Sequence, residues 1–263
     1  MASLHIQAKK FLGSWKVFRN SYLQAPLWLY EFVIRDRHYD NVLNHGFSAP
    51  RSKVYVVLQR LLWFWPRIDD ARGWAAADTG IGWDPVNYLH TYRTRLVEKI
   101  NEIVPKDASL VELGCNCGSD MNILVRDGYI HITGVDAGGR ALEMFKREYP
   151  ETYTVAMPRH DLFQRFLLGM ATGSCDYIYS NGATIELVHP SFPLVNQICR
   201  VAKKGVLLDL SERHQGYPRN YSEQFAKHGF AQVFHDETEG KSVGSSLIVF
   251  MRVGRALERK VEL

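Results

Sequence analysis

From residue 108 onward, short apolar runs alternate with stretches of helical spacing, and this alternation constrains the fold of the 263-residue chain most strongly. Strands that alternate with helices favour a parallel sheet with helices on both faces. A polar loop separates the last two apolar runs, which predicts that they form an antiparallel hairpin. We therefore predict an α/β fold with a seven-stranded, mostly parallel sheet that ends in this hairpin.

The periodicity also places the individual elements. The expected strands are residues 109–113, 131–135, 153–156, 176–180, 205–210, 230–235 and 246–252. The expected helices between them are residues 119–127, 139–149, 162–170 and 191–202. Apolar residues at helical spacing predict one more helix ahead of the sheet, from about Val86 to Ile103.

The first 80 residues differ in composition from the rest of the chain. They hold eleven Lys and Arg against six Asp and Glu, and all six Trp lie in the first third of the sequence. We expect residues 1–85 to form a helical, Trp-rich, basic cap on an α/β domain of residues 86–263. This region could serve as a substrate lid, as a homodimer surface, or as a contact with an anionic membrane surface, to which such a composition is suited. A packed cap is the interpretation that we favour.

Composition excludes several classes of protein. Hydrophobic residues make up 46% and charged residues 23%, which is typical of globular domains. The most apolar run, Val54–Trp65, is too short to span a membrane, and the N-terminal segment lacks the apolar core of a signal peptide. Four cysteines are too few for a disulfide scaffold, so we expect a reducing, cytoplasmic setting. Cys115 and Cys117 are too close for the usual zinc spacing, and we expect no metal.

The most informative segment is the turn after the first expected strand, where Gly114-Cys-Asn-Cys-Gly118 leads into a helix. Glycines in such a turn let a ligand approach the backbone closely, and the helix start presents amide groups. Asp136 ends the next strand, 22 residues beyond Gly114. This spacing suits a carboxylate that accepts hydrogen bonds from the two hydroxyls of a ribose.

Two cofactor classes use this arrangement. A dinucleotide fingerprint requires glycine where this chain has Asn116 and Ser119, so the fingerprint is not satisfied. The acidic-x-Gly-x-x-x-Gly pattern of Glu112, Gly114 and Gly118 suits a ligand without a pyrophosphate and with a cationic amino-acid end, near which Glu112 adds negative charge. S-adenosylmethionine, which carries an ammonium, a sulfonium and one ribose, fits this pattern.

Over roughly residues 105–253 the chain resembles the class I S-adenosylmethionine-dependent methyltransferases. The matching motifs are Glu112–Gly118, Asp136, Asp161-Leu162 and Asp176–Gly182. The resemblance implies a Rossmann-like sheet whose first five strands are parallel. It also implies that Asp161 lies beside the adenine amino group, with the Leu162 amide nearby, although Asp161 could instead cap a helix. The implied cofactor-binding residues are Glu112, Gly114, Cys115, Asn116, Gly118, Asp136, Ala137, Asp161, Leu162 and Asn181.

A narrower similarity concerns residues 112–124 and 180–212, which look like methyltransferases associated with pseudaminic acid and other surface-sugar pathways. It implies transfer to a hydroxyl of a sugar or sugar conjugate. A hydroxyl acceptor benefits from a positioned base, and His189 and Glu186 follow the fourth strand, at the edge where parallel sheets bind ligands. Glu186 stands where that family often has His, so this chain departs from the family pattern at that position.

Further polar residues are expected to contact the substrate. Some follow the fifth strand at the same edge of the sheet, and others lie on the helix ahead of the sheet, which in related enzymes covers the cofactor and can pair with its carboxylate. These candidates are Glu212, Arg213, His214, Tyr217, Tyr92 and Arg93.

The leading hypothesis is an enzyme that transfers a methyl group from S-adenosylmethionine to an oxygen of a small acceptor. The hydroxyl of a sugar is our first choice of acceptor. One alternative is methylation of another small metabolite or a lipid-like acceptor. Another is a cofactor-binding scaffold without activity, because histidine is absent at position 186. A nucleic-acid substrate is not expected, since no Pro-Pro-aromatic motif follows the fourth strand and the net charge is only +4.

Overall fold

A computed structural model of the chain describes residues 84–182, 185, 188, 192–211, 219–237 and 245–253. By its internal contacts the chain divides into two units, Met1–Ile68 and Asp69–Leu263, and all described residues belong to the second. The expected cap of residues 1–85 lies almost wholly outside the described residues, so the cap and its boundary stay predictions. In the described part, no helix is both long enough and apolar enough to cross a membrane.

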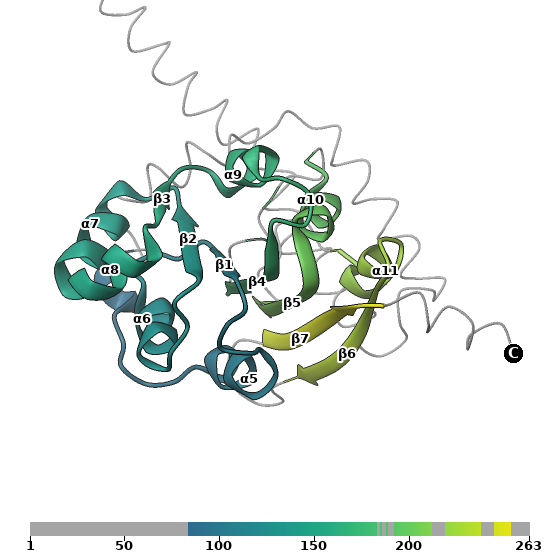
Figure 1. Cartoon of the computed structure of the whole chain (residues 1–263), viewed down its shortest axis with the longest axis horizontal. Coiled ribbons are helices and arrows are strands. Elements are labelled where there is room, and N and C mark those ends of the chain that lie inside the picture. The colour runs from purple at the N-terminus through teal and green to yellow at the C-terminus, as the bar shows by residue number, and fades with distance from the viewer. Residues whose placement is uncertain are drawn as a thin grey trace, which may run out of the picture. The chain divides into compact units, whose positions relative to one another are not determined.

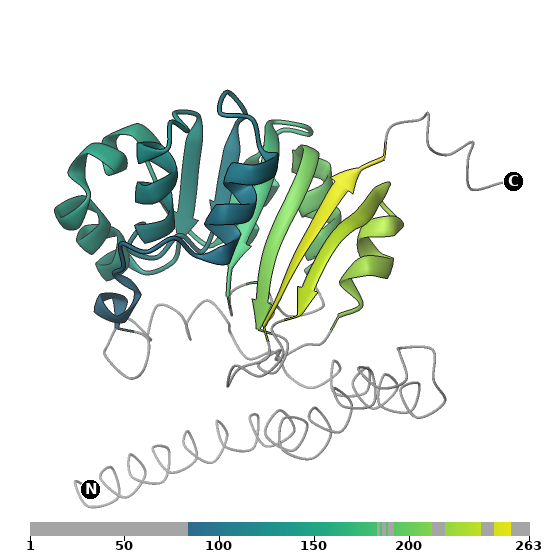
Figure 2. The same ribbon diagram turned by 90° about the horizontal axis from the view of Figure 1, so that it is seen from below.

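The described strands form one seven-stranded sheet in the order β3-β2-β1-β4-β5-β7-β6 (Figure 1). Strands β1 to β5 are parallel, whereas β7 runs antiparallel to both β5 and β6, between which it lies (Figure 2). The predicted mixed sheet with its terminal hairpin is therefore confirmed. The strands are β1 (Leu110–Leu113), β2 (Ile132–Asp136), β3 (Arg159–His160), β4 (Cys175–Asn181), β5 (Ala202–Ser211), β6 (Phe230–Glu237) and β7 (Ser245–Arg252).

Helices cover both faces of the sheet (Figure 1). One face carries α5 (Arg95–Ile103), α6 (Ser119–Arg126), α7 (Gly139–Glu148) and α8 (Pro150–Ala156). The other face carries α9 (Phe163–Gly169), α10 (Leu194–Val201) and α11 (Tyr221–Ala226), of which α11 was not expected from the sequence. Side chains of a strand alternate between the two layers: in β5, Leu207 packs in the first layer, and Val206 and Leu208 pack in the second.

The strand expected at residues 153–156 is wrong, because these residues belong to α8. The helix begins at Pro150, whose fixed backbone angle suits the first helical position. Thr152 and Ala156, four residues apart, are its buried positions, so packing follows the helical period. The third strand is instead the two-residue β3, which pairs with the end of β2.

The single helix expected from Val86 to Ile103 is also wrong in its first half. A short 3-10 helix, η2 (Pro85–Tyr88), comes first, and the backbone is extended at Leu89 and at Thr94. Thr94 is the N-cap of α5, and its hydroxyl accepts a hydrogen bond from the amide of Val97. Cap chemistry therefore starts α5 at Arg95 and leaves residues 89–94 as an extended segment.

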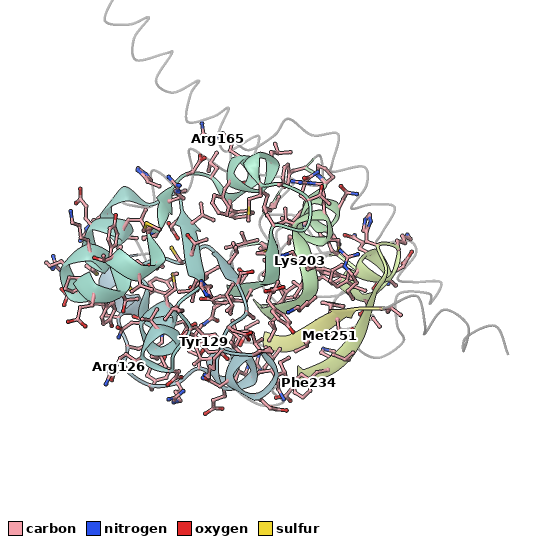
Figure 3. The ribbon with its side chains drawn as sticks, viewed as in Figure 1. Arg126, Tyr129, Arg165, Lys203, Phe234 and Met251 are labelled. Carbon is pink, nitrogen blue, oxygen red and sulfur yellow. The ribbon has the colours of Figure 1, made fainter. Side chains whose placement is uncertain are left out.

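Helix α5 is part of the sheet domain. Three of its side chains, Leu96, Val97 and Ile100, are fully buried in the layer that it shares with α6. The hydroxyl of Tyr129, which lies after α6, donates to the carbonyl oxygens of Ile100 and Val104 at 3.0 and 2.9 Å (Figure 3). These contacts hold the end of α5 and set the position of its first turn relative to the sheet.

Candidate cofactor site

The turn after β1 has the left-handed backbone that its glycines permit. Backbone φ is +77° at Gly114, +46° at Asn116 and +74° at Gly118. The amides of Gly114 and Cys115 both donate to the carbonyl oxygen of Val135, at 2.9 and 3.1 Å, which fastens the turn to β2. Cys115 and Cys117 are both buried, and burial raises the pKa of each thiol. A raised pKa disfavours the reactive thiolate form of both side chains, and the contact of Cys115 with the cofactor stays a prediction.

Asp136, at the end of β2, binds the turn through its side chain. One carboxylate oxygen accepts a hydrogen bond from the amide of Asn116 at 2.8 Å, and the other accepts from the amide of Gly138 at 2.7 Å. The next residue, Ala137, accepts through its carbonyl oxygen from the ring of His160 at 3.1 Å. The structure thus places Asp136, which is predicted to bind the ribose, in contact with the glycine turn.

Asp161 and Leu162 follow β3, next to Asp136, whose carbonyl oxygen accepts from the amide of Asp161 at 3.0 Å. The amide of Leu162 donates to the side chain of Asp161 at 2.7 Å, and the exposed Arg165 pairs with the same carboxylate at 2.6 Å (Figure 3). The two groups that are expected to contact adenine therefore bond to each other in this structure. They lie at the expected edge, and their contact with adenine stays a prediction.

Glu112 lies in β1 with only 3% of its surface exposed. Its carboxyl group accepts a hydrogen bond from the hydroxyl of Tyr179 in β4, at 2.9 Å. Burial raises the pKa of Glu112 well above its ordinary value, and the carboxylates of Asp120 and Asp136 raise it further, whereas the Tyr179 hydroxyl lowers it. The negative charge that was predicted for Glu112 is therefore costly until a cation binds nearby.

Replacing Glu112 by glutamine is expected to stabilise the protein at pH 8 by about 1 to 3 kcal/mol, the usual cost of burying a polar group whose hydrogen bonds do not fully replace its hydration. Because the folded-state pKa of Glu112 is above the unfolded value, its stabilising contribution is present at low pH and is lost as pH rises through the folded value. The gain should therefore grow from pH 5 to pH 8 in urea unfolding. Glu143→Gln, at an exposed position on α7, is the control. A gain independent of pH would contradict this account.

A second buried carboxylate, Asp120 on α6, was not singled out from the sequence. It is 5% exposed and accepts hydrogen bonds from the side-chain amide of Asn181 at 2.6 Å and the hydroxyl of Thr94 at 3.2 Å. A ring nitrogen of His90 lies 3.5 Å away. Burial raises the pKa of Asp120, against the opposing effects of Asn181, His90 and Thr94. An acidic residue in the first turn of a helix is common, so the sequence offered no particular signal for this role.

The extended segment before α5 is attached to the start of α6. The hydroxyl of Ser119 donates to the carbonyl oxygen of Tyr88 at 2.9 Å and accepts from the amide of His90 at 3.1 Å. Asp84, the N-cap of the η2 helix that precedes this segment, adds an ion pair with Arg140 of α7. The segment therefore runs past the helix end that follows the glycine turn.

The structure does not bring Arg93 to the glycine turn. Its guanidinium pairs with Asp127, which follows the last turn of α6, at the opposite end of that helix from Gly118. Tyr92 is 67% exposed and its ring stacks on that of His90, with 4.5 Å between centroids. The substrate contacts expected of Tyr92 and Arg93 stay predictions.

The remaining candidates lie outside the described residues and stay predictions. They are the proposed bases His189 and Glu186 and the proposed substrate contacts Glu212, Arg213, His214 and Tyr217. Described residues next to these positions form hydrogen bonds. The amide of Gly182 donates to the carbonyl oxygen of Asp209 at 2.7 Å, and the buried Arg219 donates to the carbonyl oxygen of Val188.

Solved structures share this architecture. Magnesium protoporphyrin IX methyltransferase from Synechocystis PCC 6803, with bound S-adenosylmethionine, matches with a TM-score of 0.56 over 71% of this chain and 98% of its own, at 12% identity. Geranyl diphosphate C-methyltransferase from Streptomyces coelicolor A3(2), crystallised with S-adenosylhomocysteine, matches with a TM-score of 0.52 over 72% and 99%, at 12% identity. The fold is that of S-adenosylmethionine-dependent methyltransferases.

The methyltransferase fold does not by itself identify an acceptor. The two neighbours are named for different substrates, a magnesium protoporphyrin and geranyl diphosphate. No family model and no curated protein matches the sequence. The acceptor must therefore be inferred from the residues of this chain.

Proposed function

We propose that this protein is a methyltransferase that binds S-adenosylmethionine at the ends of β1 and β2 and transfers its methyl group to a small acceptor. The observation that carries the proposal is the pairing of Asp136 with the amide of Asn116. It joins the glycine turn, which suits the methionine end, to the carboxylate that suits the ribose. Two expected ligands of one cofactor thus meet at neighbouring strand ends.

The donor set fits that cofactor. Asp136 can accept hydrogen bonds from ribose hydroxyls, and the buried Glu112 gains from a cation close by. When bound, S-adenosylmethionine supplies an activated methyl group on a sulfonium. The protein holds the acceptor in line with that group, which by itself supplies much of the rate enhancement.

For the acceptor we propose the hydroxyl of a sugar or sugar conjugate. Support comes from the similarity of residues 112–124 and 180–212 to methyltransferases of surface-sugar pathways. His189 or Glu186, after β4, would take the hydroxyl proton as the new oxygen–carbon bond forms. The excess of Lys and Arg over Asp and Glu in the first 80 residues suits a nucleotide-linked or otherwise anionic sugar.

Calorimetric titration with S-adenosylhomocysteine, then with NAD, tests the cofactor. We expect micromolar binding of S-adenosylhomocysteine and no binding of NAD. Asp136→Ala should weaken binding at least about 30-fold, because hydrogen bonds to a charged group contribute about 1.5 to 3 kcal/mol each. Asp107→Ala is the matched control, since it removes an exposed carboxylate just before β1, at the opposite edge of the sheet.

Two results would contradict the cofactor assignment. They are binding of NAD, or binding of S-adenosylhomocysteine that Asp136→Ala and Asp107→Ala leave equally strong. If the cofactor binds, S-adenosylhomocysteine release from S-adenosylmethionine in the presence of nucleotide sugars, compared with prenyl diphosphates, tests the acceptor. Cofactor binding without turnover of either class would favour the scaffold alternative.

A further inference from the structure

Asp120 connects three parts of the chain at the edge where β4 ends. Its carboxylate receives hydrogen bonds from Thr94, the N-cap of α5, and from Asn181, the last residue of β4. The imidazole of His90 faces the same carboxylate from the extended segment before α5. Because the side chain is 5% exposed, these neighbours leave little of it open to a ligand. Its contribution to a binding site would therefore act through one of the partners.

Asn181 is the partner through which Asp120 can act. The side-chain amide nitrogen of Asn181 donates to the Asp120 carboxyl group at 2.6 Å, so the amide oxygen of Asn181 points to the other side. Among the described residues, none donates a hydrogen bond to that oxygen. Asn181 is partly exposed, and it lies at the end of β4, next to β1. The hydrogen bond to Asp120 thus orients the side-chain oxygen of Asn181 as an acceptor at the edge of the sheet that carries the glycine turn.

The charges around this edge favour a cationic donor. Glu112, Asp120 and Asp136 lie close enough that the two aspartates act electrostatically on Glu112. The Arg95 guanidinium is held by Asp209, at 2.7 and 2.8 Å, on the α5 side. A ligand group that is both positively charged and a hydrogen-bond donor therefore suits the oxygen of Asn181 better than a neutral hydroxyl does.

We propose that Asp120 is a positioning residue that fixes the side-chain amide of Asn181, so that the Asn181 oxygen accepts a hydrogen bond from the ammonium of the cofactor's amino-acid end. The proposal rests on the proposed function, because it names a contact within the same cofactor site. It assigns the orienting role to a residue on α6, and the contact itself to a residue on β4.

Two ligands separate this contact from the rest of the site. S-adenosylhomocysteine has the amino-acid end, whereas 5′-methylthioadenosine has the adenosine and lacks that end. The measurement is the affinity of each ligand by calorimetry. Asn181→Ala and Asp120→Ala should each lower the affinity for S-adenosylhomocysteine about tenfold, since one charge-assisted hydrogen bond is lost. The affinity for 5′-methylthioadenosine should not change. The double variant should be no weaker than Asn181→Ala, because the two residues act in series.

Asp120→Asn distinguishes positioning from a direct charge effect. Its amide oxygen can still accept from Asn181, and its amide nitrogen can donate to His90, whose other ring nitrogen bonds the carbonyl oxygen of Tyr92 at 3.0 Å. This variant should keep nearly the affinity of the unmodified protein for S-adenosylhomocysteine. If Asp120→Ala does not fold, Asp120→Asn and Asn181→Ala together still test the proposal.

Several outcomes would overturn the proposal. If Asp120→Asn binds S-adenosylhomocysteine as weakly as Asp120→Ala does, the charge of Asp120 acts on the ligand directly. If Asn181→Ala lowers the affinity for both ligands to the same extent, Asn181 has a structural role only. If the unmodified protein binds 5′-methylthioadenosine but the affinity for S-adenosylhomocysteine is the same in all variants, the contact does not exist. If it binds neither ligand, the proposed function itself is wrong.

Discussion

Replacing Gly118 by alanine is expected to destabilise the domain by about 2 to 5 kcal/mol in urea unfolding. Two costs add at this position. Its φ of +74° is a left-handed conformation, which costs a residue with a side chain about 1 to 2 kcal/mol. An added Cβ would also lie 2.4 Å from ring atoms of Phe145, and forcing extra volume into a packed core costs about 1 to 3 kcal/mol. Phe145 is fully buried, so its ring has little room to move.

Two other glycines separate these costs. Gly128 has a φ of +101° and nothing within 4 Å of a built Cβ, so alanine there should show the backbone cost alone. Gly169, the last residue of α9, also has open space around its Cβ position and no left-handed backbone, and alanine there should be neutral or stabilising. Equal losses at Gly118 and Gly128 would show that the ring of Phe145 yields without cost.

Replacing Arg95 by leucine is expected to destabilise the domain by about 2 to 4 kcal/mol. Arg95 makes two hydrogen bonds with Asp209, at 2.7 and 2.8 Å, and Asp209 is only 9% exposed. Removing the guanidinium leaves a carboxylate in the interior without its main partner, which is the costly way to break such a pair. Thermal or urea unfolding at pH 7 measures the loss.

Arg93 provides the matched control two residues away. It also pairs with an aspartate, Asp127, but at the surface, where solvent screens the interaction. Arg93→Leu should leave the stability within the error of measurement. The double variant Arg95→Leu with Asp209→Leu should recover most of the loss, because an apolar pair can replace a buried ion pair at little cost. A double variant as unstable as Arg95→Leu would mean that Asp209 is not the source of the loss.

The sheet was predictable from sequence because its inner strands are short, mostly apolar runs bounded by turns, and the alternation of these runs with helices indicates a parallel sheet. The failure at residues 153–156 has a physical cause. Thr152, Thr154 and Val155 are β-branched and locally favour a strand, but Pro150 starts a helix that buries Thr152 and Ala156 on one side. Tertiary packing decided between two local preferences of similar strength.

The site was predictable to the extent that it is local. The glycine turn and Asp136 are linked by a fixed spacing, and the structure joins them. Asp120 and Asn181, 61 residues apart in sequence, meet only because β1 and β4 are neighbours in the sheet, and no local pattern records that contact. The continuous helix expected from Val86 to Ile103 was wrong because the cap at Thr94 breaks it, and Arg93, which lies before that cap, pairs with Asp127.

The position of β7 matters while the chain is being made. Among the described strands it is the last in sequence, yet it lies between β5 and β6, and it is the only described strand that pairs with β6. A ribosome that stops before residue 245 therefore releases a chain in which β5 keeps an open edge and β6 has no strand to join. Open strand edges invite pairing with other chains, so such products would aggregate or be degraded. Only chains that are synthesised through β7 can therefore complete the sheet and escape aggregation or degradation.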